Sequence, residues 1–179
     1  MDIKDCMIYE KNMPAHPAVY EEFPEDLQPE LADYLKAHGI EKLYCHQAEM
    51  FAKVNRGKNV VITTSTASGK TLSFLLPILQ EILNNPLTRA IFIYPTKALA
   101  ADQYRAIHPY LEYFGENRIV AGVYDGDTPP SERTRIRQSA NIILTNPEMV
   151  NGAFLPNHSK YGFDFIFSNL KYIVIDELH

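Results

Sequence analysis

The stretch Val61–Leu79, VITTSTASGKTLSFLLPIL, constrains this chain more than any other. It places an apolar run directly before the triplet Gly69–Thr71 and a helix-forming run directly after it. This arrangement is typical of a phosphate-binding loop, in which backbone N–H groups at a helix N-terminus meet phosphate oxygens. A chance Gly-Lys-Thr in a turn is the alternative, but chance seldom supplies both flanking elements.

One position departs from the usual pattern G-x-x-x-x-G-K-[ST], because Thr64 stands at its first glycine. That glycine mainly lets the backbone turn tightly, whereas phosphate binding depends on the later positions. Gly69, Lys70 and Thr71 keep these functions: backbone N–H groups at a helix start, a cation for the β- and γ-phosphates and a hydroxyl for Mg²⁺. We therefore predict a nucleotide site.

Compact β-rich runs alternate with helical runs along the chain. The predicted strands are NVVITTS, AIFIYP, RIVAGVYDG, NIILTNP and KYIVIDE, and the predicted helices between them are approximately Lys70–Leu83, Ala98–Phe114 and Pro130–Gln138. Near-continuous apolar strands separated by helices indicate an α/β fold with a mostly parallel sheet covered on both faces. Pro77 and Pro109 fall inside predicted helices, so we expect a kink or an early end at each.

The segment ahead of the sheet divides in two. Residues 1–28 are expected to form an extended N-terminal arm, because they are rich in Pro and Glu and show no sustained period. Residues 29–179 are expected to form one partial domain. It opens with two short helices, in PELADYLKAHGI and HQAEMFAKVNRG, which end at Gly39 and Gly57.

Composition narrows the class of protein. No apolar run approaches the roughly 18 residues that span a bilayer, and the N-terminus is not signal-like, so we expect a cytoplasmic protein with no membrane partner. Cys6 and Cys45 are too few for a zinc cage or a disulfide framework. Acidic residues outnumber basic ones, 22 to 17, so any nucleic-acid contact must be local. The cluster in SERTRIRQ is predicted to be a solvated helix face.

The last residues complete a nucleotide site. YIVIDELH is an apolar strand that ends in Asp176, Glu177 and, two residues later, His179. An Asp at such a strand end is where a phosphate-loop enzyme holds Mg²⁺, and the following Glu is placed to polarise an attacking water. Simple capping of a buried strand would explain one carboxylate, but not a pair followed by a histidine. We predict that Thr71 and Asp176 bind Mg²⁺ and that the nucleotide is ATP.

These pieces, in this order, resemble the first RecA-like domain of a superfamily 2 helicase with a DExH box. LYCHQAEMF is similar to the Q motif, TASGKT to motif I, YPTKALAADQ to motif Ia, YDGDT to motif Ib, TNPEMV to the next motif, which touches the nucleic-acid backbone, and DELH to motif II. The resemblance runs from about Phe23 to His179 and implies a RecA-like P-loop NTPase fold. Leu178 departs from the commoner Ala or Val.

Within the superfamily, GIEKLYCHQAE, TASGKTLSFLLPIL and YPTKALAADQ are most similar to the DEVH-box helicases of the MrfA/YprA type, which are linked to DNA repair and translocate 3′ to 5′. This resemblance implies an ATP-dependent helicase motor, a hydrolase in the complete enzyme, acting on single-stranded or partly duplex DNA. RNA is not excluded as a partner.

The resemblance also implies parts that this sequence does not contain: a Ser-Ala-Thr motif, a second RecA-like domain with an arginine finger and a cysteine-rich C-terminal region. In sheets of this family the Ser-Ala-Thr strand inserts between the motif I and motif II strands. We therefore expect a sheet that is incomplete at the C-terminus, with a gap between VVITT and YIVID. The 179 residues alone are expected to be marginally folded or aggregation-prone and to show no DNA-stimulated ATPase activity.

Roles follow residue by residue from the resemblance. Gln47 would read the adenine edge, and His179 would couple the γ-phosphate to the Ser-Ala-Thr segment. The implied nucleotide contacts are Gln47, Thr66, Ala67, Ser68, Gly69, Lys70 and Thr71, the implied catalytic residues are Lys70, Asp176, Glu177 and His179, and the implied nucleic-acid contacts are Thr96, Lys97, Gly126, Thr145 and Asn146.

For each nucleic-acid position, plain loop capping is the alternative. Two other classes of protein also stay open. One is a truncated, non-catalytic nucleotide or nucleic-acid interaction module. The other is a small-molecule P-loop kinase, which would not need the HQ element or the YPTKAL and TNPE loops.

Overall fold

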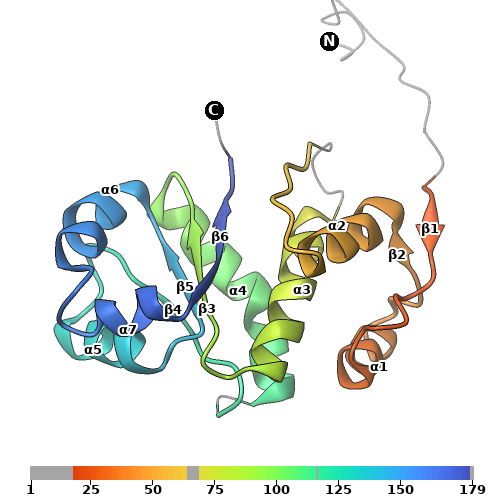
Figure 1. Ribbon diagram of the computed structural model, residues 1–179, viewed down its shortest axis with the longest axis horizontal. Coiled ribbons are helices and arrows are strands. Elements are labelled where there is room, and N and C mark those ends of the chain that lie inside the picture. Colours follow the sequence, from red (N-terminus) through yellow and green to blue (C-terminus); the bar gives the residue numbers. More distant parts are fainter. Residues whose placement is uncertain (1–17, 64–68, 116, 178–179) are drawn as a thin grey trace, which may run out of the picture.

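The computed structural model describes residues 18–63, 69–115 and 117–177, which form alternating helices and strands. The strands are β1 Tyr20–Glu21, β2 Leu43–Tyr44, β3 Arg89–Ile93, β4 Ala121–Val123, β5 Ile142–Thr145 and β6 Leu170–Ile175. The helices are α1 Pro29–Ala37, α2 Cys45–Asn55, α3 Lys70–Asn84, α4 Lys97–Phe114, α5 Pro130–Ser139, α6 Pro147–Met149 and α7 Phe163–Ser168, with a π-helical turn at Val150–Phe154 and a 3₁₀ turn at Leu155–Asn157. Figure 1 shows the sheet between α5 and α7 on one side and α3 and α4 on the other, with α1 and α2 beyond α3.

The main sheet has four parallel strands in the order β4-β5-β3-β6. Parallel neighbours need a crossover connection, and helices supply each one: α4 joins β3 to β4, α5 joins β4 to β5, and the segment from α6 to α7 joins β5 to β6. The predicted α/β class, with a mostly parallel sheet between helices, is confirmed. β1 and β2 form a separate antiparallel pair that ties part of the predicted N-terminal arm to the start of α2.

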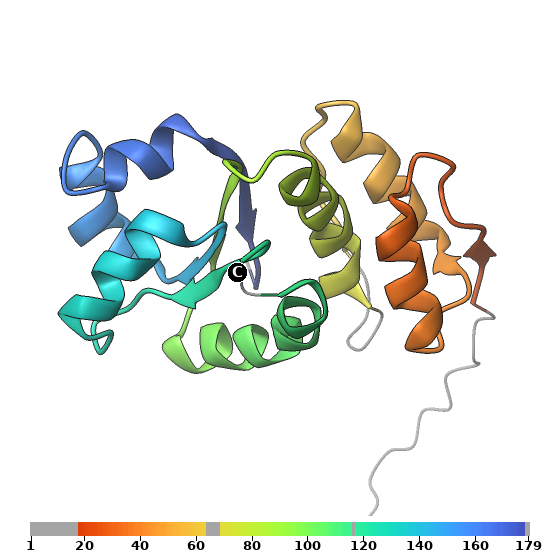
Figure 2. The same ribbon diagram turned by 90° about the horizontal axis from the view of Figure 1, so that it is seen from below.

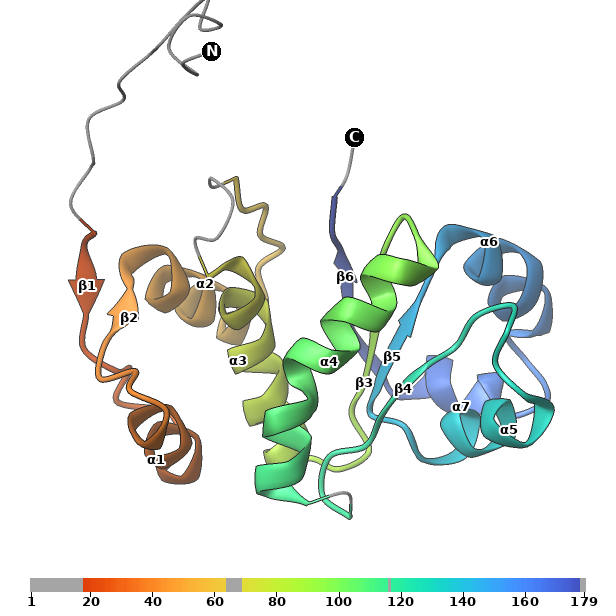
Figure 3. The same ribbon diagram turned by 180° about the vertical axis from the view of Figure 1, so that it is seen from behind.

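Alternate residues of the central strands face two different hydrophobic clusters, as the period of a strand requires. Ala90 and Phe92 of β3 pack in the cluster that contains α3 and α4. Ile91 packs in the second cluster, with Phe154 and Phe163. Figure 2 shows α4 (green) on one side of the strands and α7 (blue) on the other. Figure 3, from behind, shows α3 and α4 side by side.

The three longest helices lie close to their predicted bounds, but neither proline ends its helix. α3 continues through Pro77 to Asn84, and α4 continues through Pro109 to Phe114. We predicted a kink or an early end at each proline, and the early end is wrong. For α3 the reason is burial, since every residue from Ser73 to Gln80 is buried, which offsets the single hydrogen bond that a proline removes.

The strand predicted in NVVITTS is absent from the described residues 59–63. A strand needs a hydrogen-bonded neighbour, and among the described residues β6, at the edge of the sheet, pairs with β3 alone. Val61 is 91% exposed, and Ile173 and Ile175 of β6 are 59% and 56% exposed. A cavity of about 590 Å³ separates the segment Val60–Thr63 from β6. The predicted gap between VVITT and YIVID therefore has a counterpart in this opening.

Candidate nucleotide and nucleic-acid site

The carboxyl ends of the parallel strands bring the predicted motifs to one edge of the sheet. β3 is followed by Tyr94–Thr96, β4 by Tyr124–Asp127, β5 by Asn146 and β6 by Asp176–Glu177. Ligands of open α/β sheets bind outside the carboxyl ends of the strands. The residues from motifs far apart in the sequence thus share the edge where ligand chemistry is expected.

Gly69 shapes the entry to α3. Its φ of +76° is left-handed, a conformation that strains any residue with a Cβ. A Cβ on Gly69 would also lie 2.6 Å from Nε2 of Gln47. α3 begins directly after it at Lys70, so the helix N-terminus, which favours anions, is held at this point. The predicted loop residues Thr66, Ala67 and Ser68 lie outside the described residues.

Gln47 is buried and joins two elements of the site. Its Nε2 donates a hydrogen bond to the carbonyl oxygen of Gly69 at 3.1 Å, and its Oε1 accepts one from the backbone N–H of Tyr44 at 2.9 Å. The amide thus fixes the start of α2 to the start of α3. A second N–H and a second lone pair remain on this amide, which is the capacity that reading an adenine edge requires.

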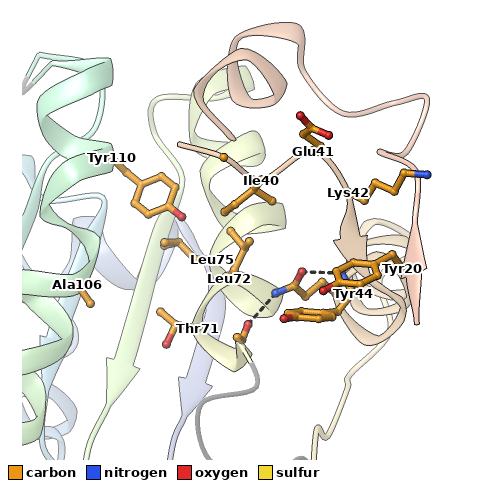
Figure 4. Close-up of a pocket in the computed structure, with 13 residues that line it drawn as sticks. Tyr20, Ile40, Glu41, Lys42, Tyr44, Thr71, Leu72, Leu75, Ala106 and Tyr110 are labelled. Atoms are coloured by element: carbon orange, nitrogen blue, oxygen red, sulfur yellow. Dashed lines mark hydrogen bonds between the residues drawn. The ribbon is translucent and has the colours of Figure 1, made fainter. Parts of the chain in front are cut away.

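A cavity of about 650 Å³ opens beside Gln47 (Figure 4). The rings of Tyr20 and Tyr44 stack at one end, with centroids 5.0 Å apart, and Tyr110 of α4 lies at the other end. The remaining walls are mostly apolar and include Ile40, Leu72, Leu75 and Ala106. A cavity with aromatic rings and a few polar groups suits a flat heteroaromatic base.

Tyr20 is a wall of this cavity that sequence reasoning missed. It reaches Tyr44 because β1 pairs antiparallel with β2, with Tyr20 opposite Tyr44. A strand of two residues in a Pro- and Glu-rich arm has no periodic signal, so the sequence offered no means of finding it.

Lys70, Asp176 and Glu177 line the second cavity, the opening of about 590 Å³ beside β6. The backbone N–H of Glu177 donates to Oδ1 of Asp176 at 3.0 Å. Glu177 has a φ of +53°, and left-handed backbone in a residue with a long side chain is uncommon and concentrates at functional sites. Leu178 and His179, which complete the predicted motif II, lie outside the described residues.

The two predicted Mg²⁺ ligands line different cavities, Thr71 the first and Asp176 the second, and both offer oxygen atoms. Mg²⁺ prefers oxygen ligands, keeps several waters and takes one or two carboxylates from the protein. Asp176 supplies a carboxylate, and among the described residues the hydroxyl of Thr71 makes one long hydrogen bond, donated to Oε1 of Gln103 at 3.3 Å. Within the described ranges, no group of three or more His, Cys, Asp or Glu side chains is arranged to hold a metal ion.

The side chains predicted to grip nucleic acid are largely engaged in the loops themselves. The Thr96 side chain accepts from the N–H of Leu99 at 3.2 Å, and the Asn146 side chain accepts from the N–H of Met149 at 2.9 Å, so both cap helices. The buried hydroxyl of Thr145 donates to the carbonyl oxygen of Tyr124 at 2.7 Å. These side chains therefore cap and order their loops, which was the alternative to nucleic-acid binding. The backbone N–H groups of the loops remain as candidates for phosphate contact.

Lys97 and Gly126 meet at the same edge, because Lys97 forms an ion pair with Asp127. Its Nζ lies 2.8 Å from Oδ2 of Asp127, and a Cβ on Gly126 would lie 3.3 Å from the same Nζ. The hydrogen bond with Asp127 raises the pKa of Lys97, and the nearby charges of Asp125 and Glu148 raise it further. Lys97 therefore carries its positive charge among three carboxylates.

Comparison with known proteins identifies the family of this chain. The sequence profile of DEAD/DEAH box helicases matches residues 44–179. The chain belongs to the DEAD/DEAH box helicase family.

This helicase chain is 44% identical over 156 residues to the ATP-dependent helicase YprA of Bacillus subtilis, which covers 87% of this chain and 20% of YprA. It is 40% identical over 178 residues to the ATP-dependent helicase HRQ1 of Saccharomyces cerevisiae, which covers 99% of this chain and 16% of HRQ1. The chain thus spans between about a sixth and a fifth of the length of these relatives.

Solved helicase structures share the fold. The crystal structure of the helicase MrfA bound to DNA and AMPPNP superposes with a TM-score of 0.84 at 40% identity, covering 89% of this chain and 22% of that one. The DEAD-box helicase Mss116, bound to ssRNA and UDP-BeF, superposes with a TM-score of 0.71 at 21% identity, covering 86% and 31%, which shows the fold alone. The predicted family and RecA-like fold are confirmed.

Two further polar residues of this helicase domain lie near predicted site residues and were missed by the sequence analysis. Gln103 of α4 contacts Thr71, as described above. Tyr94, directly after β3, is 1% exposed, and its hydroxyl has no hydrogen-bond partner among the described residues. Burial raises the pKa of Tyr94, and the charge of Asp176 raises it further. Both lie within YPTKALAADQ, but their contacts depend on strand register and helix packing.

Two expectations from composition concern the remaining surface. Arg135 forms an ion pair with Glu132 at 2.7 Å, whereas Arg133 and Arg137 lie over the rings of Tyr124 and Phe163. The cluster in SERTRIRQ is thus a solvated face only in part, since two of its arginines cover aromatic rings. Among the described residues, none of the helices is both long and apolar enough to cross a membrane.

Proposed function

We propose that this chain is the ATP- and Mg²⁺-binding part of an ATP-dependent DNA helicase motor that moves 3′ to 5′ and serves DNA repair. The observation that carries the proposal is the shared carboxyl edge of the sheet, where Asp176, which lines the cavity beside β6, and the loops that begin at Thr96, Asp125 and Asn146 all follow the ends of parallel strands. A DNA-acting motor with few cysteines fits the cytoplasm.

In this proposal the base of ATP occupies the cavity between Tyr20, Tyr44 and Tyr110, and Gln47 contacts its edge. The phosphates meet the N-terminus of α3 and Lys70, with Thr66, Ala67, Ser68 and Gly69 in the loop around them. Thr71 and Asp176 hold Mg²⁺, which neutralises phosphate charge when bound. Because Gln47 also holds Gly69, base binding and loop geometry are linked through one side chain.

Hydrolysis is proposed to proceed by attack of water on the γ-phosphate. Glu177 orients this water, and its left-handed backbone, fixed by the hydrogen bond to Asp176, holds its position relative to that carboxylate. His179 couples the site to a Ser-Ala-Thr segment. Turnover also requires a second RecA-like domain that supplies an arginine finger, so this chain alone is expected to bind ATP without DNA-stimulated hydrolysis.

DNA is proposed to lie along the loops after β3, β4 and β5. The backbone N–H groups at the starts of α4 and α6, together with Lys97 and Gly126, would contact phosphates of a single-stranded or partly duplex substrate. Such contacts grip the strand without reading its sequence. The MrfA structure with bound DNA supports DNA as the partner, and the chemistry of these contacts suits RNA as well.

The nucleotide half of the proposal is tested by titrating a fluorescent ATP analogue into wild type and Lys70→Ala. Lys70→Ala removes the cation placed at the β- and γ-phosphates, so we expect binding to be lost. Mg-ATP at a hundredfold excess over Kd should stabilise only wild type, by about 2.7 kcal/mol. Lys53→Ala, which breaks an exposed ion pair with Glu49 on α2, is the matched control. Equal affinity of wild type and Lys70→Ala would overturn the proposed site.

The DNA half is tested by fluorescence anisotropy with labelled oligonucleotides of unrelated sequence. Few phosphate contacts on an acidic chain predict weak, sequence-tolerant binding that falls steeply with salt. A tight complex that survives high salt would instead identify a dedicated, non-catalytic binding module.

A further inference from the structure

Tyr94 carries a buried hydroxyl with no hydrogen-bond partner in the parts of the chain that the structure describes. Its side chain is 1% exposed, so water does not solvate it freely. Burying a hydroxyl without a partner is unfavourable, and buried polar groups left in this state are exceptions that call for an explanation. Phenylalanine would fill the same space without that cost.

Strand register places Tyr94 next to Asp176. Ile93 of β3 pairs with Ile175 of the parallel strand β6, and the backbone N–H of Asp176 donates to the carbonyl oxygen of Ile93 at 3.2 Å. Tyr94 and Asp176 each follow these paired residues, so they lie side by side just past the ends of β3 and β6. They share a level of the sheet at its carboxyl edge.

Side-chain alternation places both residues on one face of the sheet. Phe92 and Tyr94 lie in the hydrophobic cluster that contains α3, and Val174 packs against the same cluster. Asp176, two residues after Val174, follows the same alternation. This is the face on which α3 begins, and Asp176 shares its cavity with Lys70.

We propose that Tyr94 is a positioning residue of the magnesium site, whose hydroxyl donates a hydrogen bond to a water that Mg²⁺ and Asp176 hold in common. The inference rests on the proposed function, because it needs Mg²⁺ at Asp176. The donor is committed to no other group among the described residues, it is shielded from solvent, and it lies on the same sheet face as the carboxylate. Groups in this outer position orient the ligands of a metal, and their loss typically weakens metal affinity by about 10- to 100-fold.

Tyr94→Phe separates this role from a structural one, because the two predict changes of opposite sign. If the hydroxyl serves only the bound ion, its removal leaves the melting temperature in EDTA unchanged or raises it by up to a few degrees, since an unpaired buried group is lost. The same variant should bind the fluorescent ATP analogue as wild type does in EDTA, and should lose roughly tenfold or more of the gain in affinity that Mg²⁺ gives.

Tyr172→Phe is the matched control. Tyr172 lies on β6, packs against the same cluster as Tyr94 and is half-buried, but it is nearer the amino end of its strand. Removing its hydroxyl should leave the effect of Mg²⁺ on nucleotide affinity unchanged.

Three results would overturn the inference. A lower melting temperature of Tyr94→Phe in EDTA would show a structural partner for the hydroxyl. A full Mg²⁺ effect in Tyr94→Phe, with wild type behaving as proposed, would remove Tyr94 from the site and leave the proposed function standing. Wild-type binding that does not respond to Mg²⁺ would instead contradict the proposed magnesium site itself, and with it any role for Tyr94 there.

Discussion

The β4 end of the sheet is packed on both faces, whereas the β6 end is packed on one. At the β4 end, a Cβ on Gly122 would lie 2.6 Å from Cγ1 of Ile136, and Ala121 and Tyr124 are both buried. At the β6 end, Ile173 and Ile175 are exposed, and the segment Val60–Thr63 stands across a cavity from the strand.

The two ends also differ in the side chains that follow the strands, although Nε of Arg133 and of Arg137 on α5 also lacks a partner among the described residues. Beside β4 and β5, the polar side chains of Thr145, Asn146 and Asn141 are all bonded within the chain. Beside β6, Tyr94 has an unused hydroxyl and Glu177 a strained backbone. The loops that would meet nucleic acid therefore hold their shape without a ligand, while the nucleotide end retains polar capacity for one.

The largest effect is expected at the nucleotide end, from Gly69→Ala. Left-handed strain alone costs about 1 to 2 kcal/mol, and the new Cβ would also displace Gln47. Because about 1.4 kcal/mol changes affinity tenfold, we expect nucleotide affinity to fall by roughly a hundredfold.

Titration with the fluorescent ATP analogue measures this loss. Gly57→Ala is the control, because Gly57 has a φ of +71° but nothing lies within 4 Å of its added Cβ. If both variants bind nucleotide alike, Gln47 does not depend on the space at Gly69.

The next largest effect is a loss of stability at the β4 end of the sheet, which we call the closed end because it is packed on both faces. The buried side chain of Asn141 accepts from the N–H of Val120 at 3.0 Å and donates to the carbonyl oxygens of Pro86 and Thr88 at 2.8 and 3.2 Å. Asn141→Ala leaves the N–H of Val120 unpaired, whereas the carbonyl oxygens of Pro86 and Thr88 still accept from Nη1 of Arg89. We therefore expect a loss of about 2 kcal/mol in the free energy of unfolding, measured by urea denaturation. Asn169→Ala, which removes one hydrogen bond to Phe165 near the surface, should cost far less. A similar cost for both would mean that the closed end is not held by Asn141.

A smaller effect is expected on aggregation through the β6 end of the sheet, where one face is exposed. Exposed apolar residues on an edge strand favour association between chains, so the 179-residue chain should aggregate. The double variant Ile173→Thr with Ile175→Thr keeps β-branched residues in β6 and should lower light scattering with little change in the unfolding midpoint. Val174→Thr, on the packed face of β6, should instead lower that midpoint. Unchanged scattering in the double variant would place the sticky surface elsewhere.

The smallest effect is expected on DNA affinity, when the ion pair between Lys97 and Asp127 in the nucleic-acid loops is removed. Asp127→Asn removes the ion-pair partner of Lys97, so the ammonium group becomes available to a phosphate. We expect single-stranded DNA to bind about two- to fivefold more tightly, with a salt slope steeper by about 0.7 if one phosphate contact is gained. Glu132→Gln removes a carboxylate from the ion pair with Arg135 on α5 and serves as the control for net charge. An equal gain in both variants would exclude a specific role for Lys97.

Patterns along the sequence predicted the helices whose signals are local. α3 and α5 each differ from prediction by one residue at one end, because α3 has a continuous apolar run and α5 begins at Pro130, a residue favoured in the first turn of a helix. The strand in NVVITTS failed for the opposite reason, since a strand is defined by its neighbour and the sequence of one segment says nothing about that neighbour.

The candidate site shows the same division. Lys70, Asp176 and Gln47 follow from short motifs, and the structure places them around two cavities, although their roles remain predictions. Thr145 is a residue type that suits a phosphate contact, but register turns its hydroxyl toward the carbonyl oxygen of Tyr124. Tyr20 and Tyr94 were missed, because their importance lies in strand pairings that bring distant residues together.

The helix α4 connects the nucleic-acid loop at Thr96 to the contact between Thr71 and Gln103. α4 begins at the Thr96 cap beside the nucleic-acid loops, and Gln103, in its second turn, contacts the hydroxyl of Thr71 at the nucleotide site. A helix moves as a stiff rod over this length, so a shift of its first turn is transmitted to Thr71 without any intervening hinge. Linkage between binding sites is reciprocal. If bound nucleotide changes the affinity for single-stranded DNA through α4 by some factor, bound DNA changes the affinity for nucleotide by the same factor.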